Sequence, residues 1–334
     1  MALEVIKECL SRHIGDRRFP GCAFAYGNAD AWESGTLGRI GYGPGWPEVS
    51  PSTFYDLASL TKVMATAAIF KHLVENGLVE LDKPISCTHD WVAKSDVSVR
   101  NLLTHTANLP PYFAWPSTGK EYVQRSDMAS EIETLLNGAA GQLRAVSSAT
   151  YSCIGFLFLR RIAESVTGKT LAHLFSEVVA NPLEIEATFC PEDKRACAPT
   201  SSVEPWRRSL SQGQHLQGDV HDPLAFGLGG VSGNAGMFSN LSGVALFAQS
   251  VLRDPVWWPW LIPHGDTDRG LGWQTSVPFS DALVGHSGYS GTGLWFNRGL
   301  TRFCVLLSNT VHPTGKNLGL NDVRGEFCSL AICP

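Results

Sequence analysis

The chain has 334 residues, of which 44% are hydrophobic and 17% are charged, and its formal net charge is −5. This composition is typical of a globular protein with a full-sized core, and it excludes a basic face for nucleic acid or anionic lipid. No segment approaches the roughly 18 apolar residues that span a bilayer, and residues 1–19 lack the uninterrupted apolar run of a secretory signal. We therefore expect a small-molecule substrate and a cytoplasmic location, or a periplasmic one if a leader has been removed.

The N-terminal part predicts a helix, a pair of strands and a second helix. The first helix is expected over residues 3–13. Residues 21–43 place glycine and aromatic residues around a central Gly-Asn turn, which is typical of two joined strands. Residues 60–76 return to helical periodicity, and an Asn-Gly pair provides the stop.

Helical and loop signals fill residues 78–238, with the strongest helices at 151–168 and 170–183. The final third begins with a helix over 238–254, which Asn240 or Ser242 can cap. Four short strands and a closing helix are then expected at residues 270–276, 282–288, 292–298, 302–309 and 320–333.

Strands at both ends of a chain with helices between them favour an α/β protein of the α+β type. We predict one antiparallel sheet, formed by residues 1–77 and 239–334 and flanked by the terminal helices. Residues 78–238 are predicted to form an inserted, mostly helical domain.

A serine and a lysine one helical turn apart, Ser59 and Lys62, stand at the start of the helix over residues 60–76. The helix N-terminus stabilises negative charge on the Ser59 hydroxyl, and a lysine at i+3 lies on the same face. Apolar neighbours are expected to desolvate Lys62, which lowers its pKa and frees the amine to accept a proton. The alternative is a helix cap beside a solvated lysine, because about one or two S-x-x-K patterns arise by chance in such a chain. Residues 117–120 supply a second copy in a loop.

Two further motifs follow in the sequence: Tyr-Ser-Cys at residues 151–153 and His-Ser-Gly at residues 286–288. With S-x-x-K, they resemble the ordered motifs S-x-x-K, Y-x-N and K-T-G or H-x-G of the serine β-lactamase and penicillin-recognising superfamily. The similarity is nearest to its class C β-lactamase, esterase and DD-peptidase branch. It implies a β-lactamase/transpeptidase-like fold. Three other stretches resemble the same branch, at residues 99–110, 218–239 and 285–298.

The resemblance implies a role for each motif residue. Ser59 is the acylated nucleophile, Lys62 takes or relays its proton, and Tyr151 shares the general-base duty. The backbone N–H groups of Ser59 and Tyr289 form the oxyanion hole. Ser287 and Gly288 are expected to bind substrate, because a side chain at Gly288 would crowd it. No metal or organic cofactor is implied.

Two positions depart from the family pattern. Cys153 replaces the asparagine of Y-x-N, and a thiol is a weak donor to an acylamide carbonyl. His286 replaces the lysine of K-T-G, and a histidine is mostly neutral at pH 7. Both changes favour an ester or small amide over a β-lactam. Cys153 as the nucleophile, and Tyr151 as a packing residue only, are the alternative interpretations.

The sequence therefore predicts a serine hydrolase that forms an acyl-enzyme on Ser59 and acts on carboxylic esters or small amides, with weak β-lactamase activity allowed. A DD-peptidase or D-amino-acid peptidase is the first alternative. A catalytically inactive binding or structural descendant is the second.

Other candidate residues receive structural interpretations. His215, Asp219, His221 and Asp222 match no established metal spacing, and His105 is expected to hold a turn. The tryptophan-rich segment at residues 255–263 is expected to pack in the core or a lid, with a wall for an acyl chain as the alternative. The nine cysteines contain no C-x-x-C pair and are expected to be free thiols, although Cys190 and Cys197 can pair in an exported protein.

Overall fold

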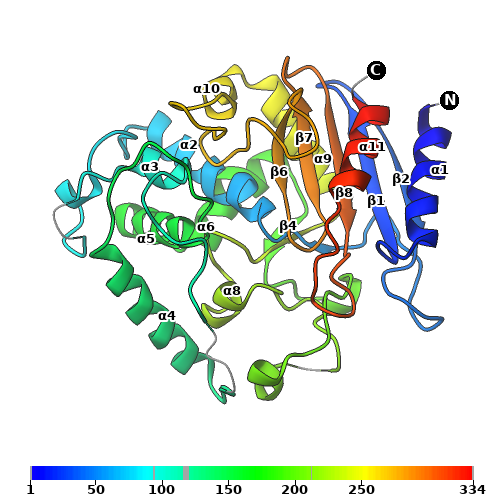
Figure 1. The fold of residues 1–334 in the computed structure, drawn as a ribbon, viewed down its shortest axis with the longest axis horizontal. Helices are drawn as coiled ribbons and strands as arrows, with labels where there is room; N and C mark the ends of the chain where they lie inside the picture. The colour runs from blue at the N-terminus through cyan, green and yellow to red at the C-terminus, as the bar shows by residue number, and fades with distance from the viewer. Residues whose placement is uncertain (1, 93–94, 116–119, 212, 333–334) are drawn as a thin grey trace.

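A computed structural model describes residues 2–92, 95–115, 120–211 and 213–332. Its main sheet has five described strands in the order β2-β1-β8-β7-β6, and every neighbouring pair is antiparallel. The first two strands of the chain therefore lie beside the last three (Figure 1). The strands are β1 (Gly21–Gly27), β2 (Trp32–Gly38), β6 (Leu283–Ser287), β7 (Gly293–Asn297) and β8 (Phe303–Ser308). The predicted antiparallel sheet built from both ends of the chain is confirmed.

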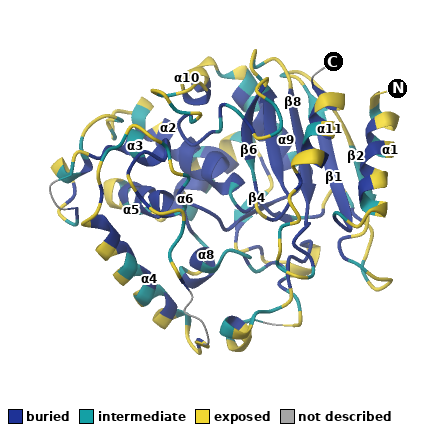
Figure 2. Cartoon of the chain, in the orientation of Figure 1, coloured by how far each residue is buried: buried dark blue, intermediate teal, exposed yellow. Residues whose placement is uncertain are grey.

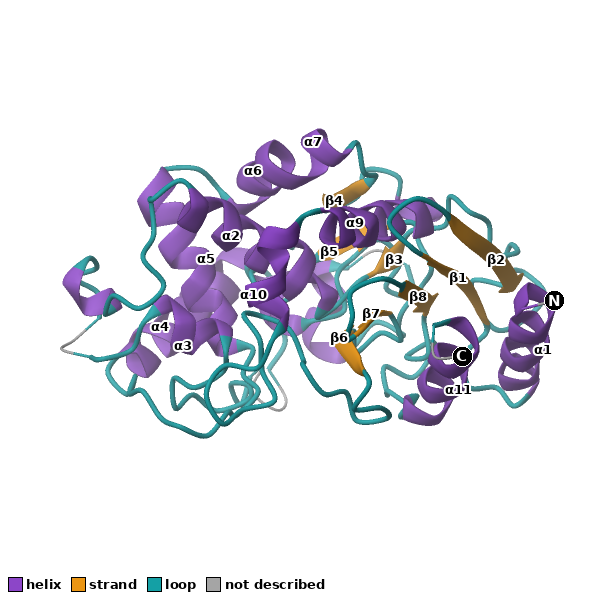
Figure 3. Ribbon diagram, turned by 90° about the horizontal axis from the view of Figure 1, so that it is seen from above, coloured by secondary structure: helices purple, strands orange, loops and turns teal. Residues whose placement is uncertain are grey.

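Helices cover both faces of this sheet because side chains along a strand point alternately to opposite sides. Phe24 of β1 belongs to a core with residues of two helices, α1 (Ala2–Gly15) and α11 (Asn321–Ala331). The next residue, Ala25, belongs to a second core that includes α9 (Leu241–Arg253). Seen from above, α1 and α11 lie on one side of the strands and α9 on the other (Figure 3).

The remaining helices form a block beside the sheet (Figure 1). Within it α5 is buried along much of its length, whereas α4 lies at the outside of the molecule with one face exposed (Figure 2). The α-helices of this block and its borders are α2 (Ala68–Glu75), α3 (Val99–Leu103), α4 (Arg125–Ala140), α5 (Ile154–Thr167), α6 (Leu171–Phe175), α7 (Asn181–Leu183), α8 (Pro223–Gly227) and α10 (Trp258–Leu261). None of the described helices has the length and apolar character to cross a membrane.

Two predicted elements differ in the structure. The segment at 270–276 is not a strand and makes only isolated bridges, at Gln274. Its Gly272 has φ of +89°, a left-handed conformation that interrupts an extended chain. The single helix expected over 170–183 is divided into α6, a π-helical turn (Ser176–Ala180) and α7.

A second sheet was not predicted from the sequence. It joins β3 (Tyr55–Asp56), β5 (Met237–Ser239) and β4 (Ala187–Phe189) in that order. Strands of two or three residues are too short to show alternation, so they leave no pattern to read. These strands connect the N-terminal part with residues 187–189 inside the helical block. The domain boundaries at residues 77 and 238 stay a prediction.

Candidate active site

A buried carboxylate shapes the turn that leads from β3 to the S-x-x-K motif. Asp56 accepts hydrogen bonds from the backbone N–H of Ala58 at 2.8 Å and of His221 at 2.7 Å. Ala58 has φ of +47°, in the left-handed region that non-glycine residues rarely adopt. The chain therefore turns sharply just before Ser59. The Asp56 carboxylate, by accepting from Ala58 and His221, holds that turn against residue 221.

The structure brings Ser59, Lys62 and Tyr151 together. Lys62 Nζ lies 3.1 Å from Ser59 Oγ, and the Tyr151 hydroxyl lies 2.9 Å from the same oxygen. Lys62 begins a π-helical turn (Lys62–Ala67) that continues into α2, and Tyr151 precedes α5. Two segments far apart in the sequence thus meet at one hydroxyl. The Ser59 hydroxyl is within hydrogen-bonding distance of two groups that can exchange protons, an amine and a phenol.

Lys62 is fully buried and each of its ammonium hydrogens has an acceptor. Besides Ser59 Oγ, Nζ donates to Asn234 O at 2.9 Å and to Cys153 Sγ at 3.4 Å. Burial alone would lower the pKa of Lys62, but its interactions with Cys153 and Tyr151, which become anionic when they lose a proton, and with Asp222 outweigh burial and raise the pKa to about 12. The direction of this pKa shift is opposite to the one expected from burial alone, and a raised pKa favours the ammonium form of Lys62.

Tyr151 is surrounded by cations and imidazole rings. Lys62 Nζ lies 5.2 Å and the Arg269 guanidinium 5.6 Å from the centre of its ring. The rings of His105 and His286 lie 4.7 Å and 5.9 Å away. Burial raises the pKa of Tyr151, and the Lys62 charge offsets part of that rise. The phenol is therefore protonated in the resting site, and its phenolate would face two positive charges.

The two backbone N–H groups expected to form an oxyanion hole are those of Ser59 and Tyr289. Among the described residues, no acceptor is hydrogen-bonded to the N–H of Ser59 or of Tyr289. Position 288, next to Tyr289, needs a glycine for a different reason from the expected one, which was space for the substrate. A Cβ there would lie 2.0 Å from Thr292 Oγ1 and 2.6 Å from Leu57 O. The glycine thus lets the H-x-G segment approach the turn before Ser59, and the main conflict of a side chain would be with the protein.

Comparisons with known proteins show the family of the chain. Residues 6–328 match the model of the Beta-lactamase family. The chain belongs to the beta-lactamase family. A curated relative, the N-acetylmuramyl-L-alanine amidase of Bacillus subtilis (strain 168), is 27% identical over 335 residues, covering 86% of this chain and 74% of the relative.

Solved structures of the beta-lactamase family confirm the fold. A class C beta-lactamase superposes with a TM-score of 0.74 at 16% identity, covering 99% of this chain and 97% of that one. A beta-lactamase/D-alanine carboxypeptidase from Pseudomonas syringae gives 0.73 at 15% identity, covering 99% and 98%. The predicted β-lactamase/transpeptidase-like fold and the resemblance to the serine β-lactamase superfamily are therefore both confirmed.

In this beta-lactamase family member, a cavity of about 550 Å³ opens at Ser59. Aromatic and small side chains form much of its wall, and three charged residues, Glu204, Asp222 and Arg324, also line it. The lining residues are Ala58, Ser59, Tyr112, Tyr151, Cys153, Glu204, His221, Asp222, Pro223, Ala235, Gln274, His286, Ser287, Gly288, Tyr289, Gly315, Asn317 and Arg324. Seven of the eight residues expected at the site line this cavity. The eighth, Lys62, is buried and does not line it.

Three residues that position the site were missed from the sequence: Asp56, Asn234 and Arg324. Arg324 lies on α11, is buried, and donates to Gly288 O at 3.1 Å. Asn234 lies in the stretch at 218–239 that resembles the family. It contacts Lys62 through its backbone oxygen, and because every residue has such an oxygen, the sequence gives no sign of this contact. Of the three, only Asp56 could have been considered from the sequence, because it is an acidic residue three positions before Ser59.

The residues with structural interpretations make separate contacts. His105 has φ of +61°, and its Nδ1 accepts from the N–H of Ser152 at 3.0 Å, as expected of a residue that holds a turn. Asp222 caps α8 through the N–H of Ala225. The ring of His221 stacks on Tyr289.

The tryptophans and cysteines away from Ser59 serve packing. Trp257 and Trp260 are buried and pack on each other, and none of the described residues at 255–263 lines the cavity. Cys190 and Cys197 are not bonded to each other: their sulfur atoms lie against Gly229 O and Asp193 O. Ser117 of the second S-x-x-K lies outside the described residues.

His286 is expected to leave no trace in the pH profile of this enzyme near neutrality. Burial, together with the Lys62 and Arg269 charges, lowers the pKa of His286 to about 3. Its ring is therefore neutral at every pH above about 4, whereas Tyr151, with a raised pKa, must lose a proton before it can act as a base. We expect kcat/KM to rise with pH on the alkaline side, and any inflection between pH 5 and 7 to come from Asp56, whose pKa is raised to about 6, and to persist in His286→Gln. An inflection near 6.5 that disappears in His286→Gln would contradict this.

Asp56→Asn is expected to weaken both the fold and the site. The substituted amide can accept only one of the two N–H bonds and turns a donor toward the other N–H group. Burial raises the pKa of Asp56 to about 6, so the wild-type group is a carboxylate at pH 7.5. We expect a loss of about 1–3 kcal/mol in the free energy of unfolding, measured in urea. The exposed Asp30→Asn serves as the control, and equal stability of the two variants would disprove the role of Asp56.

Proposed function

We propose that this beta-lactamase family member is a serine hydrolase that forms an acyl-enzyme on Ser59 and cleaves carboxylic esters or small amides. The observation that carries the proposal is the convergence of Tyr151 OH and Lys62 Nζ on Ser59 Oγ, at 2.9 Å and 3.1 Å. The unpaired N–H groups of Ser59 and Tyr289 supply the second requirement, donors for the oxyanion.

Acylation begins when the Lys62–Tyr151 pair has lost one proton. The proton comes from Tyr151, because Lys62 keeps three acceptors and stays an ammonium. The phenolate takes the proton of Ser59 Oγ while Oγ attacks the substrate carbonyl carbon, and the oxyanion forms against the two backbone N–H groups. When the intermediate collapses, Tyr151 returns the proton to the leaving alcohol or amine, and the acyl group stays on Ser59.

Deacylation uses the same groups with water as the nucleophile. The Tyr151 phenolate takes a proton from water, and the resulting hydroxide adds to the acyl carbonyl carbon. Collapse of this second intermediate breaks the bond to Ser59 Oγ, which recovers a proton from Tyr151. The Lys62 ammonium stays charged throughout and lowers the energy of each phenolate state.

The choice of substrate rests on what the cavity lacks. Cys153 lines it where an amide donor would bind an acylamino carbonyl, and the thiol sulfur already accepts from Lys62. His286 is buried and neutral, so it supplies no charge for a substrate carboxylate. Tyr112, Tyr289 and Pro223 offer apolar surface instead. This apolar surface suits a neutral acyl group, and the one arginine among the lining residues, Arg324, is already bonded to Gly288 O.

The test is a side-by-side rate comparison on p-nitrophenyl esters of increasing chain length, nitrocefin and D-alanyl amides. We expect the largest kcat/KM with an ester and slow nitrocefin turnover. Cys153→Asn, which adds an amide donor, should move the preference toward amides by about tenfold, the worth of one hydrogen bond. Absence of turnover on every substrate, together with no labelling of Ser59 by a fluorophosphonate, would reject hydrolysis and favour an inactive descendant.

A second candidate is an amidase or DD-peptidase that acts on wall-type peptides. The name of the Bacillus subtilis relative, an N-acetylmuramyl-L-alanine amidase, favours it. Penicillin acylation separates the two candidates. A long-lived penicilloyl adduct with faster release of D-alanine than of p-nitrophenol would favour the peptidase, whereas rapid ester turnover without a stable adduct favours the ester hydrolase.

A further inference from the structure

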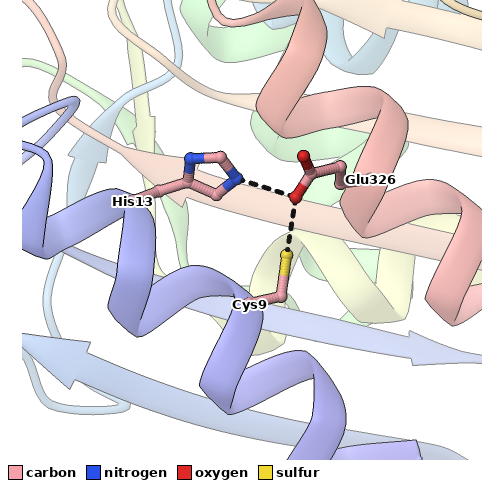
Figure 4. A group of neighbouring side chains, drawn as sticks. All are labelled: Cys9, His13 and Glu326. Carbon is pink, nitrogen blue, oxygen red and sulfur yellow. Dashed lines mark hydrogen bonds and ion pairs between the residues drawn. The ribbon is translucent and has the colours of Figure 1, made fainter.

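A cluster of three potential metal ligands lies between the first and last helices, away from the Ser59 cavity. Cys9 and His13 are one turn apart on α1, and Glu326 projects toward them from α11 (Figure 4). Glu326 Oε2 lies 3.3 Å from Cys9 Sγ and 3.1 Å from His13 Nε2. All three donor atoms lie within 4.8 Å of one another. The two helices pack side by side on the same face of the sheet (Figure 3).

From this geometry we propose that Cys9, His13 and Glu326 bind a zinc ion that joins α1 to α11. Zinc bonds of about 2.0–2.3 Å in a tetrahedral site place neighbouring donor atoms roughly 3.3–3.7 Å apart, close to the two distances observed. A thiolate, an imidazole and a carboxylate form a donor set that suits zinc, whereas magnesium and calcium prefer oxygen ligands only. With three protein ligands, water completes the coordination.

Burial and access fit such an ion. Cys9 and His13 are buried and held in place by the packing of α1, so two of the ligands are already ordered. Glu326 is exposed, and a recess of about 510 Å³ between the two helices, lined in part by Cys9, Arg12 and Glu326, opens to solvent. An ion can therefore enter from the surface without unfolding either helix.

The cluster already attracts a cation. An Arg12 guanidinium nitrogen is hydrogen-bonded to Glu326 Oε2 and lies 3.8 Å from Cys9 Sγ. Its side chain is largely exposed, so it can swing into water when a metal ion binds. Arg12 is thus a competitor for the site, and its removal should strengthen zinc binding. The opposite sign is expected if the cluster is only a hydrogen-bonded contact that Arg12 completes.

The full chain, stripped with a chelator and kept reduced, is titrated with Zn²⁺ against a chromophoric indicator and separately with Co²⁺. We expect one Zn²⁺ per chain, a rise in Tm with Zn²⁺ and none with Mg²⁺, and a thiolate-to-cobalt absorption band. Cys9→Ser should abolish the band, and His13→Gln should weaken Zn²⁺ binding by tenfold or more. Cys190→Ser, which removes an exposed thiol elsewhere, is the matched control and should change nothing.

Arg12→Met provides an independent test of zinc binding if Cys9→Ser or His13→Gln folds poorly. It leaves all three ligands intact and is expected to tighten Zn²⁺ binding several-fold. A band that survives in Cys9→Ser, no stoichiometric Zn²⁺ uptake by the wild type, or weaker binding in Arg12→Met would each overturn the proposal. These readouts measure metal binding and do not depend on hydrolysis at Ser59.

Discussion

Ser59→Ala is expected to abolish acyl transfer, with a loss of at least about 10³-fold in kcat for every substrate that the wild type turns over. Alanine removes the oxygen to which both Tyr151 and Lys62 are hydrogen-bonded, which is also the proposed nucleophile. The side chain is small and the turn is held by Asp56, so the Tm should stay within a few degrees of the wild-type value. The measurements are steady-state kinetics and fluorophosphonate labelling followed by mass spectrometry.

Ser117→Ala provides the matched control, because it changes the serine of the other S-x-x-K pattern. It should retain full activity and full labelling. Labelling that persists in Ser59→Ala and maps to Cys153 would instead identify the thiol as the nucleophile. Unchanged activity in Ser59→Ala would remove the basis of the proposed mechanism.

Tyr151→Phe is expected to reduce kcat by about 10²–10⁴-fold, the usual contribution of a positioned general base. The change deletes the oxygen that lies 2.9 Å from Ser59 Oγ and leaves the ring between its cations and imidazoles. Because the remaining activity no longer depends on a phenolate, the alkaline rise in kcat/KM should flatten. A full pH profile of both proteins provides the measurement.

Tyr42→Phe is a suitable comparison, because it removes a tyrosine hydroxyl that bonds to Arg17 O outside the cavity. It should change kcat by less than about twofold, as expected for a surface substitution away from the site. If Tyr151→Phe kept activity within a few-fold of the wild type, the base would be another group, and Lys62 is the nearest.

Much of the architecture could be predicted because its signals are local. The strand pair at residues 21–43 and the last three strands are short apolar or aromatic runs bounded by turn residues, and these signals need no knowledge of the fold. The prediction of a strand at 270–276 was wrong for the same reason, because apolar residues between glycines look like a strand whether or not they pair with another strand. The three-stranded sheet of β3, β4 and β5 depends on contacts across the chain that no short window records.

The chemistry of the candidate site was harder to predict than its residues. Order and spacing were enough to select Ser59, Lys62 and Tyr151. The pKa of Lys62 depends on Cys153 and Tyr151, both distant in the sequence, so the apolar neighbours alone gave the opposite direction. Likewise, the need for glycine at 288 follows from Leu57 and Thr292, which only the folded chain brings near it.

Pairing of β1 with β8 has a consequence for how the protein is made. On the ribosome, β1 emerges early and has only β2 to pair with until almost the whole polypeptide has been translated. On the Phe24 side the new hairpin has only α1 to pack against until α11 is made, and α11 also brings the arginine that holds Gly288. A chain whose synthesis stops before α11 would therefore lack both this cover and the Arg324 contact to Gly288, and its exposed hydrophobic surface would be open to proteases and chaperones.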